Sequence, residues 1–195
     1  MKAENTKDIL KDFQIITERY DAFFVTAILG DPKVGKTSII NRMFEGTFSE
    51  NYEKSTKFEV RDYFFQKGKK RIKIMIYLVS GERGDVLIRS QLLKRIDCPI
   101  IVYDMSSRES IENIKVWLNE IESYAKPKKV IIVGNKNDLK REFTLEDFEH
   151  LRSPYNTTVM DCSAKEDKHI KAIFEFLGQY FFEQAFGNGA KEEKK

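Results

Sequence analysis

Residues 30–37 carry two glycines, a lysine and a threonine at the spacing of a phosphate-binding loop. The segment Gly30-Asp31-Pro32-Lys33-Val34-Gly35-Lys36-Thr37 fits the pattern G-x-x-x-x-G-K-[ST]. Glycines let a backbone approach a ligand closely, and the N–H groups of such a loop attract negative charge. We therefore expect Lys36 to reach the β- and γ-phosphates of a nucleotide and the Thr37 hydroxyl to bind Mg²⁺. A glycine turn without a ligand is the alternative.

The residues around this loop indicate a strand before it and a helix after it. Residues 22–29 form an apolar, β-branched and aromatic run of strand length. After the loop, apolar residues recur at helical spacing from Ile39 to Phe44, so a helix N-terminus adds its dipole to phosphate binding. The side chain of Lys33 is expected to face either the phosphates or solvent. The predicted phosphate-binding residues are Asp31, Pro32, Lys33, Val34, Gly35, Lys36, Thr37 and Ser38.

Two polar motifs follow later strands and predict which base is bound. The first, Asn135-Lys136-Asn137-Asp138, comes directly after the buried run 130–134. A carboxylate at Asp138 can accept hydrogen bonds from N1–H and N2–H₂ of guanine, which adenine does not present. The second, Ser163-Ala164-Lys165, follows the run 157–160 and places a backbone N–H for guanine O6 and a lysine stem over the base. The three motifs, in this order, predict a guanine-nucleotide site.

Alternating strand and helix patterns predict an α/β fold that brings these motifs together. Strands spaced by helices give a mostly parallel, six-stranded sheet with one antiparallel hairpin edge and helices on both faces, the architecture of a P-loop NTPase. Its ligand lies at the carboxyl ends of the strands. The predicted strands are 22–29, 56–65, 71–79, 98–104, 130–134 and 157–160, and the predicted helices follow residue 37 and cover 85–96, about 111–121, 145–151 and 166–184.

The chain divides into a short extension, one domain and a tail. Residues 1–21 form the extension, in which residues 5–20 have the apolar spacing of an amphipathic helix. That helix either packs on its own domain or docks a partner. Residues 22–185 form the domain, and 186–195 are a hydrophilic tail that we expect to be flexible.

Composition excludes several classes of protein. The formal charge of +3 comes from 34 basic and 31 acidic residues, a balance that does not predict nucleic-acid binding. No run of about 18 apolar residues is present, so no transmembrane helix is predicted.

Cys98 and Cys162 are far apart and are expected to be reduced and buried in a cytoplasmic protein. The basic hairpin tip at 67–73 is read as a solvated turn, with an anionic lipid or acidic partner as the alternative.

With these motifs the chain resembles the Ras superfamily of small GTPases, and within it the Rab family. Residues 101–106 and 116–118 are similar to stretches of that branch. The resemblance implies that Phe48 stacks against guanine and that Tyr52 lies near the start of the first switch loop. It also implies that Ser55 or Thr56 supplies a switch hydroxyl to Mg²⁺. GTP and GDP are then the ligands, and effector, exchange and activating proteins bind at the switch loops.

The second switch motif departs from the family pattern. Family members carry Asp-x-x-Gly-Gln, in which the aspartate holds Mg²⁺ through water and the glutamine orients the attacking water. Here the stretch reads Leu78-Val79-Ser80-Gly81-Glu82. Gly81 can still offer its N–H to the γ-phosphate, but Leu78 cannot bind a hydrated cation, and the charge of Glu82 faces the γ-phosphate.

These departures predict slow GTP hydrolysis with weakened dependence on Mg²⁺, with Lys36 and Glu82 as the catalytic residues. The alternative is a non-catalytic guanine-nucleotide-binding scaffold. A P-loop kinase or ATPase is disfavoured by the motif at 135–138. Rab proteins usually end in prenylated cysteines, and residues 190–195 contain none. The resemblance therefore implies a cytoplasmic protein of vesicle traffic that reaches the cytosolic face of endomembranes through a partner or through residues absent from this chain.

Overall fold

The computed structural model describes residues 19–50, 58–82, 86–142 and 156–187. Several sequence-based expectations fall outside these ranges and stay predictions. They are the helix at 5–20, except for its last two residues, the helix at 145–151, the tail beyond residue 187, and the switch residues Tyr52, Ser55 and Thr56.

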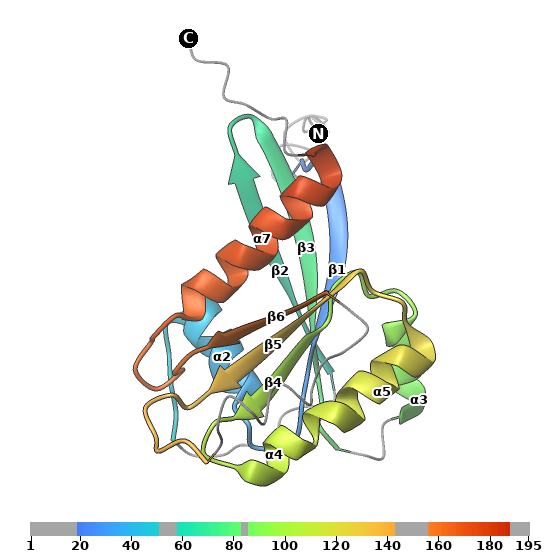
Figure 1. Ribbon diagram of the computed structural model, residues 1–195. Helices are drawn as coiled ribbons and strands as arrows, with labels where there is room; N and C mark the ends of the chain where they lie inside the picture. The colour runs from blue at the N-terminus through green and yellow to red at the C-terminus, as the bar shows by residue number, and fades with distance from the viewer. Residues whose placement is uncertain (1–18, 51–57, 83–85, 143–155, 188–195) are drawn as a thin grey trace, which may run out of the picture.

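Six strands form one mixed sheet in the order β2-β3-β1-β4-β5-β6. All neighbouring strands are parallel except the edge pair β2 and β3, which forms a long hairpin (Figure 1). The predicted six-stranded, mostly parallel sheet with one antiparallel edge is therefore confirmed. The strands are β1 (Ala22–Leu29), β2 (Phe58–Lys67), β3 (Lys70–Val79), β4 (Ile100–Asp104), β5 (Lys129–Asn135) and β6 (Asn156–Asp161).

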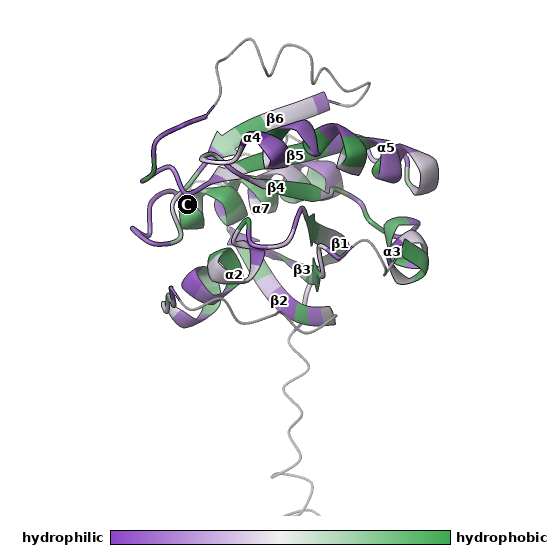
Figure 2. Cartoon of the chain, turned by 90° about the horizontal axis from the view of Figure 1, so that it is seen from below, coloured by the Kyte–Doolittle hydropathy of each residue, from purple (hydrophilic) through white to green (hydrophobic). Residues whose placement is uncertain are grey.

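Helices cover both faces of the sheet, so there are two apolar layers. On one face, α2 (Lys36–Glu45) and α7 (Ile170–Phe186) pack on strand residues that include Ile74 and Leu78. On the other, α3 (Val86–Leu93), α4 (Arg108–Glu112) and α5 (Ile114–Tyr124) pack on residues such as Ile101. Each fully buried aliphatic or aromatic side chain stabilises the fold by roughly 1.5–3 kcal/mol. Figure 2 shows hydrophobic central strands between helices that carry both hydrophobic and hydrophilic residues.

Two helices differ from the prediction. The last helix begins at Ile170 and not at residue 166, because Asp167 and His169 have positive φ angles of 55° and 61° and Ser163 forms a β-bridge with Lys168. Such angles lie outside the right-handed helical region. The helix predicted around 111–121 is interrupted at Asn113, which separates α4 from α5. This interruption places the Asn113 side chain beside the phosphate loop.

Both cysteines are free and buried, as the sequence predicts. Burial raises the pKa of Cys98 and of Cys162 to about 12, so both are protonated thiols near neutral pH. Within the described ranges, no helix combines the length and apolar character needed to cross a bilayer.

Candidate functional site

The phosphate loop joins β1 to α2 and holds its lysine in a buried position. Gly35 has a φ of 93°, and a Cβ atom there would lie 2.2 Å from Nδ2 of Asn135, so the position requires glycine. Lys36 is 5% exposed, and its Nζ donates hydrogen bonds of 2.8 and 2.7 Å to the carbonyl oxygens of Gly30 and Asp31. Burial lowers the pKa of Lys36 to about 8, while the nearby Asp31 carboxylate partly opposes this shift. The loop thus presents a buried ammonium group that two of its own carbonyl oxygens hold in place.

A cavity of about 440 Å³ connects this loop to the two later motifs. It is open to solvent and lies at the carboxyl ends of the parallel strands, where a ligand is expected in such a sheet. Asp31, Val34 and Ser163 do not line it, although all three were predicted from the motifs. The predicted residues that do line it are Pro32, Lys33, Gly35, Lys36, Thr37, Ser38, Phe48, Gly81, Glu82, Asn135, Lys136, Asp138, Ala164 and Lys165.

Asn135 links the two ends of the cavity. Its Nδ2 donates a 2.9 Å hydrogen bond to the carbonyl oxygen of Val34, and its Oδ1 accepts one of 3.1 Å from the N–H of Ala164. Nearby, the Ser163 hydroxyl donates a 2.5 Å hydrogen bond to Oδ1 of Asp138. Ser163 therefore holds the Asp138 carboxylate from outside the cavity. One asparagine fixes the spacing between the phosphate loop and the end of the cavity predicted to bind the base, which we call the base end.

Lys136 and Lys165 occupy two sides of the base end. Nζ of Lys136 lies 2.5 Å from Oδ2 of Asp104, and the residue has a positive φ of 63°. Nζ of Lys165 lies 2.7 Å from Oε1 of Glu50 across the cavity. The hydrogen bond of this pair raises the pKa of Lys165 and lowers that of Glu50. Both side chains of the second pair are more than half exposed, so screening by water keeps it weak.

Sequence reasoning missed several residues that line the cavity or hold its lining in place. Arg42, in α2, donates hydrogen bonds of 2.9 and 3.2 Å to the carbonyl oxygens of Ala164 and Lys165, and its guanidinium carbon lies 5.7 Å from the Phe48 ring centroid. It thereby holds residues 164 and 165 beside α2. No motif spacing marks it, because an arginine on an amphipathic helix usually faces solvent. The lining residues that were not predicted are Asn41, Ser49, Glu50, Ser80 and Leu139.

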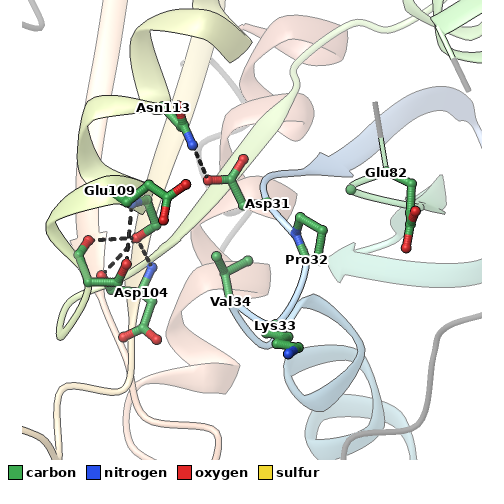
Figure 3. A pocket seen from close by; sticks show the side chains of 11 residues that line it. Asp31, Pro32, Lys33, Val34, Glu82, Asp104, Glu109 and Asn113 are labelled. Atoms are coloured by element: carbon green, nitrogen blue, oxygen red, sulfur yellow. Dashed lines mark hydrogen bonds between the residues drawn. The ribbon is translucent and has the colours of Figure 1, made fainter. Parts of the chain in front are cut away.

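The side chain of Asp31 faces the opposite side of the phosphate loop. Nδ2 of Asn113 donates to Oδ2 of Asp31 at 2.8 Å, and Nε1 of Trp117 donates to Oδ1 at 2.9 Å. These contacts border a second cavity of about 430 Å³ between the loop and α4 (Figure 3). Glu82 and Lys33 line both cavities. The Asp31 carboxylate therefore anchors the loop to the α4–α5 junction.

A family model for the Ras family matches residues 26–182 of this chain. The chain belongs to the Ras family. Its relatives include the Ras-related protein Rab-19 of Rattus norvegicus, 28% identical over 168 residues that cover 84% of this chain and 77% of that protein. The GTP-binding protein ypt1 of Schizosaccharomyces pombe is 27% identical over 172 residues, covering 87% of this chain and 85% of that protein. The Ras-related protein RABD2a of Arabidopsis thaliana is 28% identical over 179 residues, covering 88% of each chain.

The resemblance drawn from the motifs is therefore confirmed: this Ras-family chain is a small GTPase most like the Rab proteins. Its second switch motif is where it departs from the Ras-superfamily pattern. Leu78 is 2% exposed and belongs to the apolar layer under α2 and α7, so it lies in the core and offers no metal ligand. Glu82 is exposed at the edge of the cavity. Ser80, which is 7% exposed, also lines the cavity, and its Oγ accepts a 3.2 Å hydrogen bond from the N–H of Glu82.

The oxygen groups of the cavity fit the Mg²⁺ that Ras-family proteins use. Mg²⁺ takes oxygen ligands and is usually held by one or two protein groups together with substrate phosphates and water. The Thr37 hydroxyl lies in the cavity lining beside Lys36, and the Ser80 hydroxyl provides a second oxygen there. Among the described residues, no group of three or more His, Cys, Asp or Glu side chains is placed to hold a metal by itself. Nucleotide phosphates and water would therefore supply most of the ligands.

Proposed function

We propose that this protein is a guanine-nucleotide switch of the Rab type that hydrolyses GTP slowly and depends only weakly on Mg²⁺. The observation that carries the proposal is the single cavity lined by Lys36, Thr37 and Asp138, with Asn135 bridging its two ends. Phosphate recognition and base recognition thus meet in one place.

The Asp138 carboxylate favours binding of guanine over adenine. A carboxylate at Asp138 accepts two hydrogen bonds from guanine, whereas adenine leaves the charged group without donors. Competition of GTP and ATP against a fluorescent GDP derivative tests this directly. We expect GTP to displace the probe and ATP to fail at equal concentration. Equal displacement by both nucleotides would refute guanine specificity.

The phosphate loop contributes charge and positioning to the chemistry. Lys36 is buried next to the loop carbonyls and can turn its ammonium group toward the β- and γ-phosphates. The N–H groups at the start of α2 add hydrogen-bond donors, because the first turn of a helix leaves them without internal partners. When bound, Mg²⁺ would neutralise developing phosphate charge. Thr37 would hold it, with Ser55 or Thr56 as the further candidates that lie outside the described residues.

The low hydrolysis rate follows from two replacements. Leu78 removes the carboxylate that would orient a metal-bound water, and Glu82 replaces the neutral side chain that positions the attacking water. A carboxylate beside the γ-phosphate adds repulsion where charge develops. Single-turnover hydrolysis with and without Mg²⁺ tests this statement. A rate equal to that of an ordinary Rab protein would contradict it.

A second candidate function is a guanine-nucleotide-binding module without turnover. The burial of Leu78 in the core favours it, because this position contributes to packing and not to the metal site. The same single-turnover experiment separates the two candidates, since the module shows tight nucleotide binding and no phosphate release over many hours.

The cellular role proposed here is that of the Rab branch. Effector, exchange and activating proteins would bind at the two switch loops, at the cytosolic face of endomembranes in vesicle traffic. A pull-down with the protein loaded with GDP or with a non-hydrolysable GTP analogue tests this role. Identical partners in both states would contradict a switch and favour the binding module.

A further inference from the structure

Gly81 lies directly on the backbone of the phosphate loop. A Cβ atom at this position would come within 2.5 Å of the carbonyl oxygen of Gly30 and within 2.6 Å of the Pro32 nitrogen. Only glycine fits there without displacing the loop. Gly81 also lines both cavities that flank the loop. The first residues of the second switch region therefore rest on the phosphate loop itself.

A buried arginine holds the residue that follows Gly81. Arg89, in α3, is 2% exposed, and its Nη1 donates a 2.6 Å hydrogen bond to the carbonyl oxygen of Glu82. Its Nε and Nη2 bind the two carboxylate oxygens of Glu120, in α5, at 2.7 and 3.3 Å. The planar guanidinium fork lets one side chain make all three contacts, which a lysine cannot do. Arg89 thus ties residue 82 to α5.

Trp117 connects this arginine back to the phosphate loop. The guanidinium carbon of Arg89 lies 5.3 Å from the centroid of the Trp117 ring, within cation–π range. Nε1 of the same indole donates the 2.9 Å hydrogen bond to Asp31. The contacts therefore form a closed circuit, which runs from Asp31 through Trp117 and Arg89 to Glu82 and returns to the loop at Gly81.

We propose that Arg89 is a positioning residue for the terminal phosphate of GTP: by holding the Glu82 carbonyl it keeps the Gly81 N–H at the phosphate loop. The inference rests on the nucleotide binding proposed above. A donor that is in place before the ligand arrives needs no reorganisation when it meets the phosphate charge. GDP lacks that phosphate, so Arg89 acts on GTP binding and leaves GDP binding unchanged. This distinguishes Arg89 from Lys36, which serves both nucleotides.

The test compares GTP with GDP on the full chain. Affinities for fluorescent GDP and for a fluorescent, non-hydrolysable GTP analogue are measured for the unmodified protein and for Arg89→Lys. The lysine keeps a positive charge beside Glu120 but cannot also reach the Glu82 carbonyl. We expect the affinity for the GTP analogue to fall roughly tenfold, the size of one hydrogen bond to a charged group, while GDP affinity stays within about twofold.

A matched control and a second variant sharpen the comparison. Arg108→Lys makes the same change at an exposed arginine that pairs with Glu112 on α4, and it should alter neither affinity. Trp117→Phe removes the indole N–H and opens the circuit at another point. In the double variant Arg89→Lys/Trp117→Phe, the loss of affinity for the GTP analogue should be smaller than the product of the two single losses, because each change breaks the same circuit.

Three outcomes would overturn the inference. One is an unchanged ratio of the two affinities in a folded Arg89→Lys variant, and another is a double variant whose effects multiply. If Arg89→Lys does not fold, Glu120→Gln replaces it, because glutamine keeps the shape of the glutamate that pairs with Arg89. An unchanged ratio of the GTP-analogue and GDP affinities in that variant counts equally against the inference. The third is an unmodified protein that binds neither nucleotide, which would also refute the proposed function. Normal binding with an unchanged ratio refutes only the role of Arg89.

Discussion

Nδ2 of Asn135 donates a 2.9 Å hydrogen bond to the carbonyl oxygen of Val34, across 101 positions of the chain. Together with the bond from the N–H of Ala164 to Oδ1, this side chain joins the phosphate end of the cavity to the base end. Asn135 is 2% exposed, so water cannot easily replace these bonds.

Asn135→Ala should therefore weaken both the fold and nucleotide binding. The variant leaves the carbonyl oxygen of Val34 and the N–H of Ala164 without partners in a buried place, which costs about 1–3 kcal/mol for each unsatisfied group. Urea denaturation of the nucleotide-free protein measures the free energy of unfolding. Asn119→Ala, at an exposed position of α5, is the control, and equal unfolding midpoints for the two variants would contradict the bridging role.

Asp138→Asn should change which base is bound. The amide can donate to the C2 carbonyl of xanthine but can no longer accept both hydrogen bonds of guanine. We expect affinity for GDP to fall and affinity for xanthosine diphosphate to rise. Asn137→Ser, at the neighbouring position, is the comparison variant in a titration with both nucleotides. The prediction fails if Asp138→Asn keeps the preference for GDP.

Lys36→Ala should abolish nucleotide binding while the domain stays folded. The change removes the ammonium group expected to meet the phosphates. Lys33→Ala is the matched control, because Lys33 is a lysine of the same loop that is exposed at the cavity rim. Circular dichroism reports the fold and a fluorescent GDP titration reports binding. GDP binding at parental strength in Lys36→Ala would mean that the loop is a structural turn.

Nucleotide affinity should fall as the pH rises above about 8, because the pKa of Lys36 is lowered to about 8 in the free protein and the phosphates require the charged form. Binding above that pH takes up a proton, which calorimetry detects in buffers with different heats of ionisation.

The free energy of unfolding should change in the opposite direction and rise with pH over the same range. Because the folded pKa lies below the unfolded value of 10.5, the cost of burying the charge is full below pH 8 and disappears toward pH 10.5. Lys36→Met carries no titratable group at this position, so its free energy of unfolding should lack this rise between pH 8 and 10.5.

Removing Mg²⁺ with a chelator should accelerate GDP release only slightly. Leu78 supplies no carboxylate, and losing an outer-shell ligand typically costs about 10–100-fold in metal affinity or activity. Leu78→Asp should partly restore the dependence, although a carboxylate at this buried position also destabilises β3. Ile76→Asp, two residues earlier in the same apolar layer, controls for that destabilisation. Rapid release from the unmodified protein after chelation would show that another residue supplies the metal ligand.

Local sequence patterns determined the sheet, the phosphate loop and the base motifs. Residues 26–29 of β1, 100–103 of β4 and 130–133 of β5 are buried on both faces, and such strands are recognisable because nearly every residue in these runs is apolar. Gly35 and Lys36 were recognisable because their spacing follows from the geometry of one loop. These features depend on neighbours within a few positions, which a sequence displays directly.

Only the tertiary structure decided which distant side chains support the site. Trp117 and Asp31 are 86 positions apart, and Arg42 and Ala164 are 122 apart, so no spacing pattern records either contact. Nothing in the local sequence distinguishes Arg89 from a solvent-exposed arginine. In the structure it is 2% exposed, because α3 and α5 enclose it against Glu120. A buried charge is stable only with its partners in place, and those partners meet only after the helices have packed on the sheet.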